Sequence, residues 1–158
     1  RAPIVIQFTD PMPMMNDPFK LSRFVEAQAP VYRRVLDELQ AGRKTTHWMW
    51  FVFPQVSGLG RSEMAERYGL SGAAEARAYL DHPLLGSRLE ACVITFLRHE
   101  DKSALQILGS PDHMKLHSCL TLFIAIAPEV LVFQQALDRF YSGRADERTL
   151  ALLKGDRG

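Results

Sequence analysis

Two stretches of this 158-residue chain gather the side chains best suited to chemistry, RKTTHWMWFVFPQVSGLGRS at 43–62 and GSPDHMKLHSCLTLF at 109–123. The first holds both tryptophans, with a histidine before them and a glutamine and an arginine after them. Aromatic rings crowded by a few polar groups are typical of small-molecule sites. We therefore predict that this stretch forms part of a ligand pocket, to which it contributes His47, Trp48, Trp50, Gln55, Arg61 and Ser62.

The aromatic stretch also has a purely structural interpretation. Trp48, Phe51 and Phe53 would fill a core, because aromatic rings bury large areas. The glycines of SGLGRS would let the backbone approach a ligand, yet their spacing matches neither a phosphate-binding loop nor a complete dinucleotide motif. A turn in which Ser62 caps the next helix explains the same residues.

The second stretch carries an amine and a hydroxyl on what we expect to be a helix. Asp112 suits the positive end of the helix dipole, which is a structural role. Lys115 and Ser118 share the side of the helix that Cys119 and Leu122 continue, so they border a buried face. A lysine in such a place needs a carboxylate, a carbonyl or an anionic ligand, or else it extends to solvent.

No metal site and no cofactor are predicted. His113 and His117 are four residues apart and share a helix face, but no glutamate follows His113 and no third ligand is evident. Cys92 and Cys119 each sit in an apolar run, which is typical of buried, reduced thiols in a cytosolic protein.

Length and charge limit the classes of function. A chain of this length fits one domain with a self-sufficient core, and its formal net charge of +1 offers no footprint for nucleic acid or an anionic membrane. No stretch is apolar enough to span a membrane, and the N-terminus does not resemble a signal peptide. We expect a cytoplasmic protein, monomeric or weakly dimeric, whose partner is a small molecule rather than nucleic acid or a membrane.

The elements that position these residues are expected to be helices, because apolar residues recur at helical spacing between prolines of fixed φ. We predict a compact all-α domain of eight to ten helices with irregular orthogonal packing over residues 16–158, preceded at 1–15 by a flexible N-terminal arm or an extension. HWMWFVF would be a short buried helix that Pro54 ends. Helix starts and stops are marked by Pro18, Pro30, Pro83, Pro111 and Pro128, and by Gly42 and Gly143.

Five segments closely resemble the bacterial domain-of-unknown-function family numbered 1810: DPFKLSRFVEAQAPVYRRVLDEL, GRKTTHWMWFVFPQVSGLGRS, ARAYLDHPLLGSRL, LGSPDHMKLHSCLTLF and FYSGRADERTLALL. The resemblance covers residues 16 to 153. It implies a compact all-α fold in a bacterial cytoplasmic protein, and it brings no established activity. Some members carry the label calpastatin, but inhibitors of that type are disordered, whereas this chain has strong helix punctuation.

The resemblance also implies which positions matter. The family pattern falls on Lys44, His47, Trp48, Trp50, Phe51, Pro54, Gln55, Gly58, Gly60, Ser62, Asp112, Lys115, Ser118 and Thr121. The family usually has a second serine after Ser118, where this chain has Cys119. If that hydroxyl takes part in a reaction, the departure weakens a catalytic interpretation.

A fainter similarity links the chain to the helical N-glycosidase group, whose members act on ADP-ribose-like or related glycosylamine substrates. It rests on the order of an EARAYL helix, an HPLLGSRL helix and a late polar segment. Such enzymes use carboxylates near the glycosidic carbon, and the candidates here are Asp112, Glu63 and Glu75. The similarity is an analogy at the level of the fold.

Three functions therefore fit the sequence. The first is a domain that binds a small anionic or nucleotide-like ligand, with Lys115 and Arg61 facing its negative charge. The second is a hydrolase of N-glycosidase type, in which His47 or Asp112 acts as acid or base. The third is a structural or protein-interaction module without a ligand. The first requires residues 44–62 and 110–121 to face one shared cavity.

Overall fold

The computed structural model describes residues 16–155, so the arm predicted at 1–15 lies outside the described residues. Within them the all-α prediction is confirmed, and no strand forms apart from an isolated bridge between Val56 and Leu70. Nor does this part of the chain contain a helix long and apolar enough to cross a bilayer. The ten helices are α2 (Ser22–Gln28), α3 (Tyr32–Ala41), α4 (Met49–Val52), α5 (Glu63–Tyr68), α6 (Ala73–Asp81), α7 (Leu85–Leu97), α8 (Ala104–Leu108), α9 (Asp112–Ile126), α10 (Leu131–Tyr141) and α11 (Glu147–Gly155).

Most helices begin or end close to the prolines and glycines that were predicted to mark them. Gly42 ends α3 with a left-handed φ of 74°, and its N–H donates to the carbonyls of Glu38 and Leu39. HWMWFVF forms the short buried helix α4, which stops at Phe53 before Pro54. Helix α9 begins after Pro111 without a side-chain cap, although a serine, Ser110, stands just before it.

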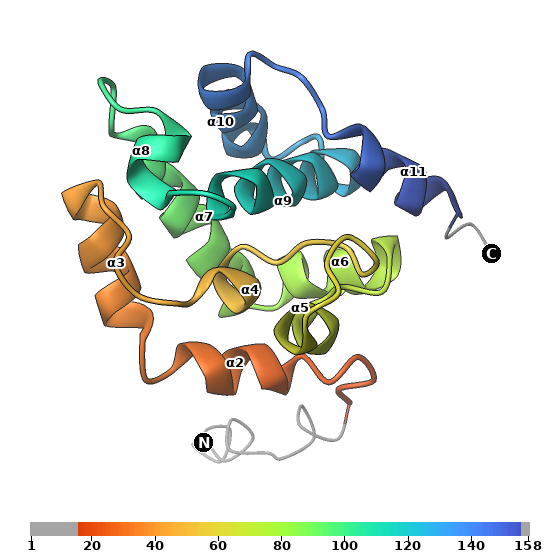
Figure 1. Ribbon diagram of the computed structural model, residues 1–158. Coiled ribbons are helices and arrows are strands. Elements are labelled where there is room, and N and C mark those ends of the chain that lie inside the picture. The colour runs from red at the N-terminus through yellow and green to blue at the C-terminus, as the bar shows by residue number, and fades with distance from the viewer. Residues whose placement is uncertain (1–15, 156–158) are drawn as a thin grey trace, which may run out of the picture.

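Helix α9 is the centre of the core. Figure 1 shows it crossing the middle of the molecule, with α10 and α11 on one side and α4, α5 and α6 on the other. Since a helix surrounded by other helices must be apolar on most sides, its middle carries a continuous buried run. The buried residues of α9 are Leu116, Ser118, Cys119, Leu120, Thr121, Leu122 and Phe123.

Both cysteines lie in this core as free thiols, as their apolar surroundings predict. Burial raises the pKa of Cys92 to about 12, and the nearby Tyr32 and Arg88 only partly offset that effect. Burial also raises the pKa of Cys119. Neither thiol is therefore a nucleophile under ordinary conditions.

A buried glutamine joins four helices around the aromatic segment. Gln28 Nε2 donates to the carbonyl of Phe51 over 2.7 Å and to the hydroxyl of Tyr79 over 3.1 Å. Gln28 Oε1 accepts a hydrogen bond of 3.2 Å from Arg88 Nη1. With its polar atoms satisfied, the buried amide fixes α4 relative to α2, α6 and α7.

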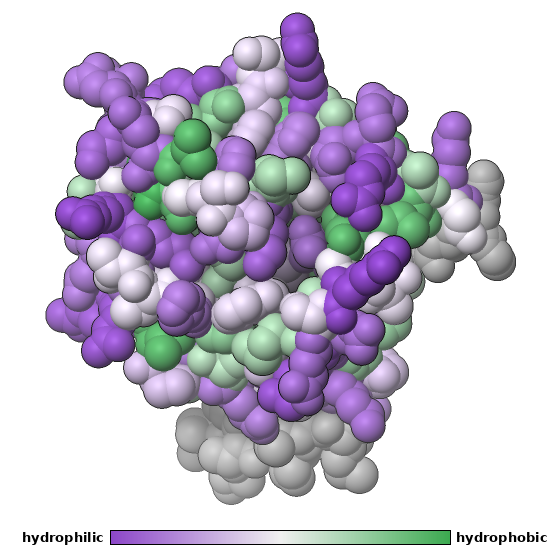
Figure 2. Space-filling model, viewed as in Figure 1, coloured by the Kyte–Doolittle hydropathy of each residue, from purple (hydrophilic) through white to green (hydrophobic). Residues whose placement is uncertain are grey.

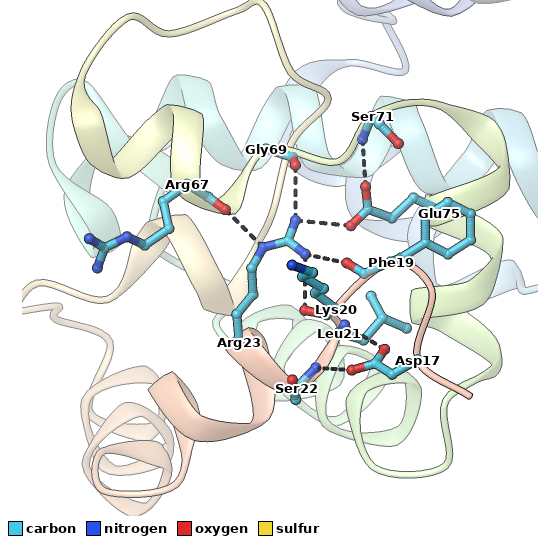
Figure 3. A network of polar contacts seen from close by, with 10 residues as sticks. All are labelled: Asp17, Phe19, Lys20, Leu21, Ser22, Arg23, Arg67, Gly69, Ser71 and Glu75. Carbon is cyan, nitrogen blue, oxygen red and sulfur yellow. Dashed lines mark hydrogen bonds and ion pairs between the residues drawn. The ribbon is translucent and has the colours of Figure 1, made fainter. Parts of the chain in front are cut away.

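Arg23 connects α2 to the loop between α5 and α6, as Figure 3 shows. Its Nη2 lies 2.9 Å from Glu75 Oε2 and donates to the Gly69 carbonyl, while Nε donates to the Arg67 carbonyl over 2.8 Å. The other oxygen of Glu75 accepts the N–H of Ser71. Both oxygens of Glu75 are therefore held by hydrogen bonds that fix the connection between α5 and α6.

We expect Arg23→Ala to lower the free energy of unfolding by about 2–4 kcal/mol, because it leaves the buried Glu75 carboxylate without its cation and several carbonyls without donors. Urea denaturation measures the change. Arg77→Ala is the matched control, since Arg77 pairs with Asp81 and Glu129 at an exposed surface and its loss should have little effect. Equal losses in the two variants would contradict the assignment of Arg23 as a structural clamp.

Candidate functional site

The two chemistry-bearing stretches meet at one hollow of about 370 Å³. It opens where the loop before α4 faces the junction of α8 and α9. On the face of the molecule shown in Figure 2, hydrophilic side chains predominate and smaller hydrophobic patches lie between them. The wall is shared almost equally by the two segments. It consists of Lys44, Thr45, Thr46, His47, Met49, Trp50, Leu108, Ser110, Pro111, Asp112 and Lys115.

Glu38 fixes the wall of the hollow that the loop before α4 forms. Its Oε1 accepts the N–H groups of Thr45 and Thr46 over 2.9 and 3.2 Å and the indole N–H of Trp48 over 2.9 Å. Its Oε2 accepts the Thr46 hydroxyl over 2.6 Å. Burial raises the pKa of this carboxyl, but the hydrogen bonds outweigh that effect and lower the pKa from 4.5 to about 2.

A carboxylate between two lysines forms the charged centre of the hollow. Asp112 Oδ2 lies 2.8 Å from Lys44 Nζ, and Asp112 Oδ1 lies 3.7 Å from Lys115 Nζ. The side chains of Lys44, Asp112 and Lys115 are 6%, 19% and 23% exposed, so all three are largely removed from water. Electrostatic forces act more strongly here than on an open surface.

The two tryptophans occupy different layers. Trp48 is 1% exposed and belongs to the core, whereas the half-buried Trp50 lines the hollow. Each ring has a lysine over its face, with Lys44 Nζ 5.0 Å from the Trp48 ring and Lys115 Nζ 5.0 Å from the Trp50 ring. Such cation–π contacts restrict where each ammonium group can point.

A narrow pocket adjoins the hollow behind Trp50. Met49, Trp50 and Lys115 line both spaces, and Gln55 and Tyr68 border the narrow one. Its volume is about 10 Å³, which is about the space of one water molecule. The hollow is therefore deep enough for a ligand only on the side of Lys44 and Asp112.

Besides Trp48 in the core and Gln55 beside the narrow pocket, four more residues predicted from the sequence lie away from the hollow. Ser62 caps α5 by accepting the N–H of Ala65, and the exposed Arg61 precedes it. Ser118 donates to Asp146 Oδ2 over 2.9 Å, and Thr121 accepts the N–H of Asp146 over 2.9 Å. The last two residues fasten α11 to α9.

Asp146 is one of two structural carboxylates that the sequence analysis did not identify. Burial raises its pKa, but hydrogen bonds from Thr149 and Ser118 outweigh this and lower it. The other is Glu38, for which a signal existed: it lies within the apolar stripe of α3, between Val35 and Leu39. A carboxylate in such a stripe requires buried donors.

The histidine pair of α9 is used for packing contacts. His113 Nδ1 lies 3.3 Å from the Gly109 carbonyl, and His117 stacks on Tyr141 with its Nε2 2.6 Å from the Arg144 carbonyl. Across residues 16–155 no group of three His, Cys, Asp or Glu side chains is arranged to hold a metal ion.

Comparison with known proteins identifies relatives without an assigned activity. The family model described as "Protein of unknown function (DUF1810)" matches residues 18–153. The chain is similar to the crystal structure of the conserved hypothetical protein Rv1873 from Mycobacterium tuberculosis, with 52% identity, a TM-score of 0.86, and coverage of 87% of this chain and 99% of that chain. No curated protein matches the chain. The predicted resemblance is thereby confirmed, and function has to be inferred from the hollow.

We expect Glu38→Gln to lower the free energy of unfolding by about 2–3 kcal/mol at neutral pH, because the charged acceptor of four hydrogen bonds becomes an amide that can accept only in part. Since folding lowers the pKa of Glu38 from 4.5 to about 2, its contribution is complete above about pH 4.5 and disappears as the pH falls toward about 2. Urea denaturation of both proteins at several pH values measures the difference in their free energies of unfolding, which should narrow as the pH falls.

The control for this experiment is Glu100→Gln, an exposed carboxylate just after α7. Its stability should follow that of the unmodified protein at every pH. If the difference in free energy of unfolding between Glu38→Gln and the unmodified protein stays constant down to about pH 3, Glu38 does not act as a charged acceptor.

Proposed function

The chain belongs to the DUF1810 family of proteins of unknown function, and we propose that it uses the hollow to bind a small anionic molecule. One observation carries this proposal: two largely buried ammonium groups flank one carboxylate in a hollow that the half-buried indole of Trp50 borders. A binding role needs nothing beyond such a preformed, mixed polar and aromatic wall.

The charges of the hollow favour an anion. Lys44 and Lys115 outnumber Asp112, which leaves one net positive charge among these three side chains. The N-terminal end of α9 also opens here, and its aligned peptide dipoles add positive potential. Because the lysines are shielded from water, their field is less screened than that of surface lysines.

Lys115 is the group we assign to contact the ligand. Its ammonium is held above Trp50 and within 3.7 Å of Asp112, so its orientation is restricted before a ligand arrives. A preoriented group loses less conformational entropy on binding, which improves affinity. Trp50 supplies the apolar wall, and the exposed His47 at the rim is available as a further donor.

A hydrolytic role is a second candidate, because Asp112 and His47 line the same hollow. Asp112 lies between two ammonium groups, where a carboxylate can act as a nucleophile or stabilise developing positive charge. Of the other carboxylates considered, Glu75 is bonded to Arg23, and Glu63 does not border the hollow. Asp112 is therefore the residue on which this candidate depends.

Tryptophan fluorescence during titration with inorganic phosphate and pyrophosphate tests the binding proposal. We expect saturable changes that weaken with added salt, since the attraction is electrostatic. Lys115→Gln should weaken binding at least about tenfold by removing a charged hydrogen-bond donor, which is about 1.4 kcal/mol. Trp50→Phe should remove most of the spectral response, because Trp48 lies in the core.

Lys154→Gln is the charge-matched control, since Lys154 is exposed on α11 and does not border the hollow. It should bind as the unmodified protein does. The absence of a saturable response to either anion, or equal weakening in the two lysine variants, would count against the proposal.

A further inference from the structure

The hollow presents a fixed acceptor as well as donors. Each oxygen of Asp112 faces one ammonium group, Oδ2 that of Lys44 and Oδ1 that of Lys115. A carboxylate has about four lone-pair positions, so positions remain free on the partly exposed side of Asp112. A ligand that carries a hydroxyl can donate a charge-assisted hydrogen bond to them.

This acceptor discriminates against bare anions. An anion that contacts Lys115 also comes close to Asp112, because the two groups are only 3.7 Å apart. Like charges repel at such distances in a partly buried site. A hydroxyl on the same ligand, placed between its anionic group and Asp112, replaces this repulsion with a hydrogen bond.

Lys44 positions the acceptor and does not reach the ligand. Its side chain is 6% exposed, its ammonium lies over Trp48, and it holds Asp112 at 2.8 Å. Its backbone N–H donates to the Ile107 carbonyl over 2.8 Å, which joins the two walls of the hollow. The ligand therefore meets a donor from Lys115 and an acceptor from Asp112, side by side.

The remaining wall also suits a hydroxylated ligand. The side chains of Thr45 and Ser110 border the hollow, and within residues 16–155 their hydroxyls have no hydrogen-bond partner. A hydroxyl both donates and accepts, so each can pair with a ligand hydroxyl. Thr46 differs, because its hydroxyl is bound to Glu38.

The volume limits the size of the ligand. About 370 Å³ is near the lower end of the range of about 300–1,000 Å³ typical of ligand sites. Beyond Trp50 and Lys115 the space narrows to about 10 Å³, which leaves no room for a second ring system. The hollow is suited to one small ring with its substituents.

We propose that the ligand is a monosaccharide phosphate, with its phosphate on Lys115, a sugar hydroxyl on Asp112 and the sugar ring against Trp50. This inference rests on the proposed anion-binding function and narrows it to a substrate class. It requires that the two halves together bind more tightly than either alone: free phosphate lacks a ring for Trp50 and a hydroxyl spaced to reach Asp112 while the phosphate contacts Lys115, and free sugar lacks the charge for Lys115.

Calorimetric titration of the full chain compares inorganic phosphate, glucose, and three sugar phosphates, namely glucose 6-phosphate, fructose 6-phosphate and ribose 5-phosphate. We expect at least one sugar phosphate to bind about tenfold more tightly than inorganic phosphate, and glucose to bind more weakly than both. If phosphate binds and none of the three sugar phosphates exceeds it, the inference is overturned while anion binding stands. If no anion binds at all, the proposed function itself fails.

Asp112→Asn tests the role of the acceptor. The preference for the sugar phosphate over inorganic phosphate should fall at least about fivefold, because the asparagine carries no charge. The control is Asp101→Asn, at an exposed site after α7, which should keep the full preference. Circular dichroism melts show whether the variant folds, since Lys44 loses its partner. A folded Asp112→Asn protein that keeps the full preference would overturn the assignment, and the ligand series on the unmodified protein decides the matter if the variant does not fold.

Discussion

The architecture of the hollow depends on one buried carboxylate. Glu38 accepts four hydrogen bonds from Thr45, Thr46 and Trp48, and it thereby converts a loop without helical hydrogen bonds into a rigid wall. Lys44 begins that wall and Trp50 ends it. Because a loop of this kind has little packing of its own, its conformation is fixed only as firmly as these bonds are.

The opposite wall has a different origin, because it is the first turn of α9, the helix that crosses the middle of the molecule. From Leu116 to Phe123, α9 is surrounded by other helices, and its first turn carries Asp112 and Lys115 into the hollow. A charged pair at the end of a core helix moves little, since the rest of the helix is packed on several sides. The hollow thus lies between a helix fixed by packing and a loop fixed by hydrogen bonds.

The local features of the sequence predicted the helices well and the partners of side chains poorly. Prolines and glycines mark helix ends through φ alone, so α3, α4, α7 and α10 follow from short windows. The separation of Trp48 from Trp50 does not, because both lie in one apolar run whose periodicity is uninformative. Ser118 and Thr121 looked like ligand groups, yet their partner Asp146 is 25 or more residues further along the chain. Glu38 was missed for a different reason: its place in the apolar stripe of α3 signals a buried carboxylate, but its donors lie 7 to 10 residues further along in a loop whose path no pattern gives.

The burial of both thiols has a practical meaning for experiments on this chain. Cys92 and Cys119 are buried residues of α7 and α9. A reagent that modifies sulfur can reach them only when the centre of the protein opens. The rate of alkylation therefore reports how often the core opens. A cysteine introduced at an exposed position such as Leu105 would react first, which allows a dye to be attached at one chosen point without removing the native residues.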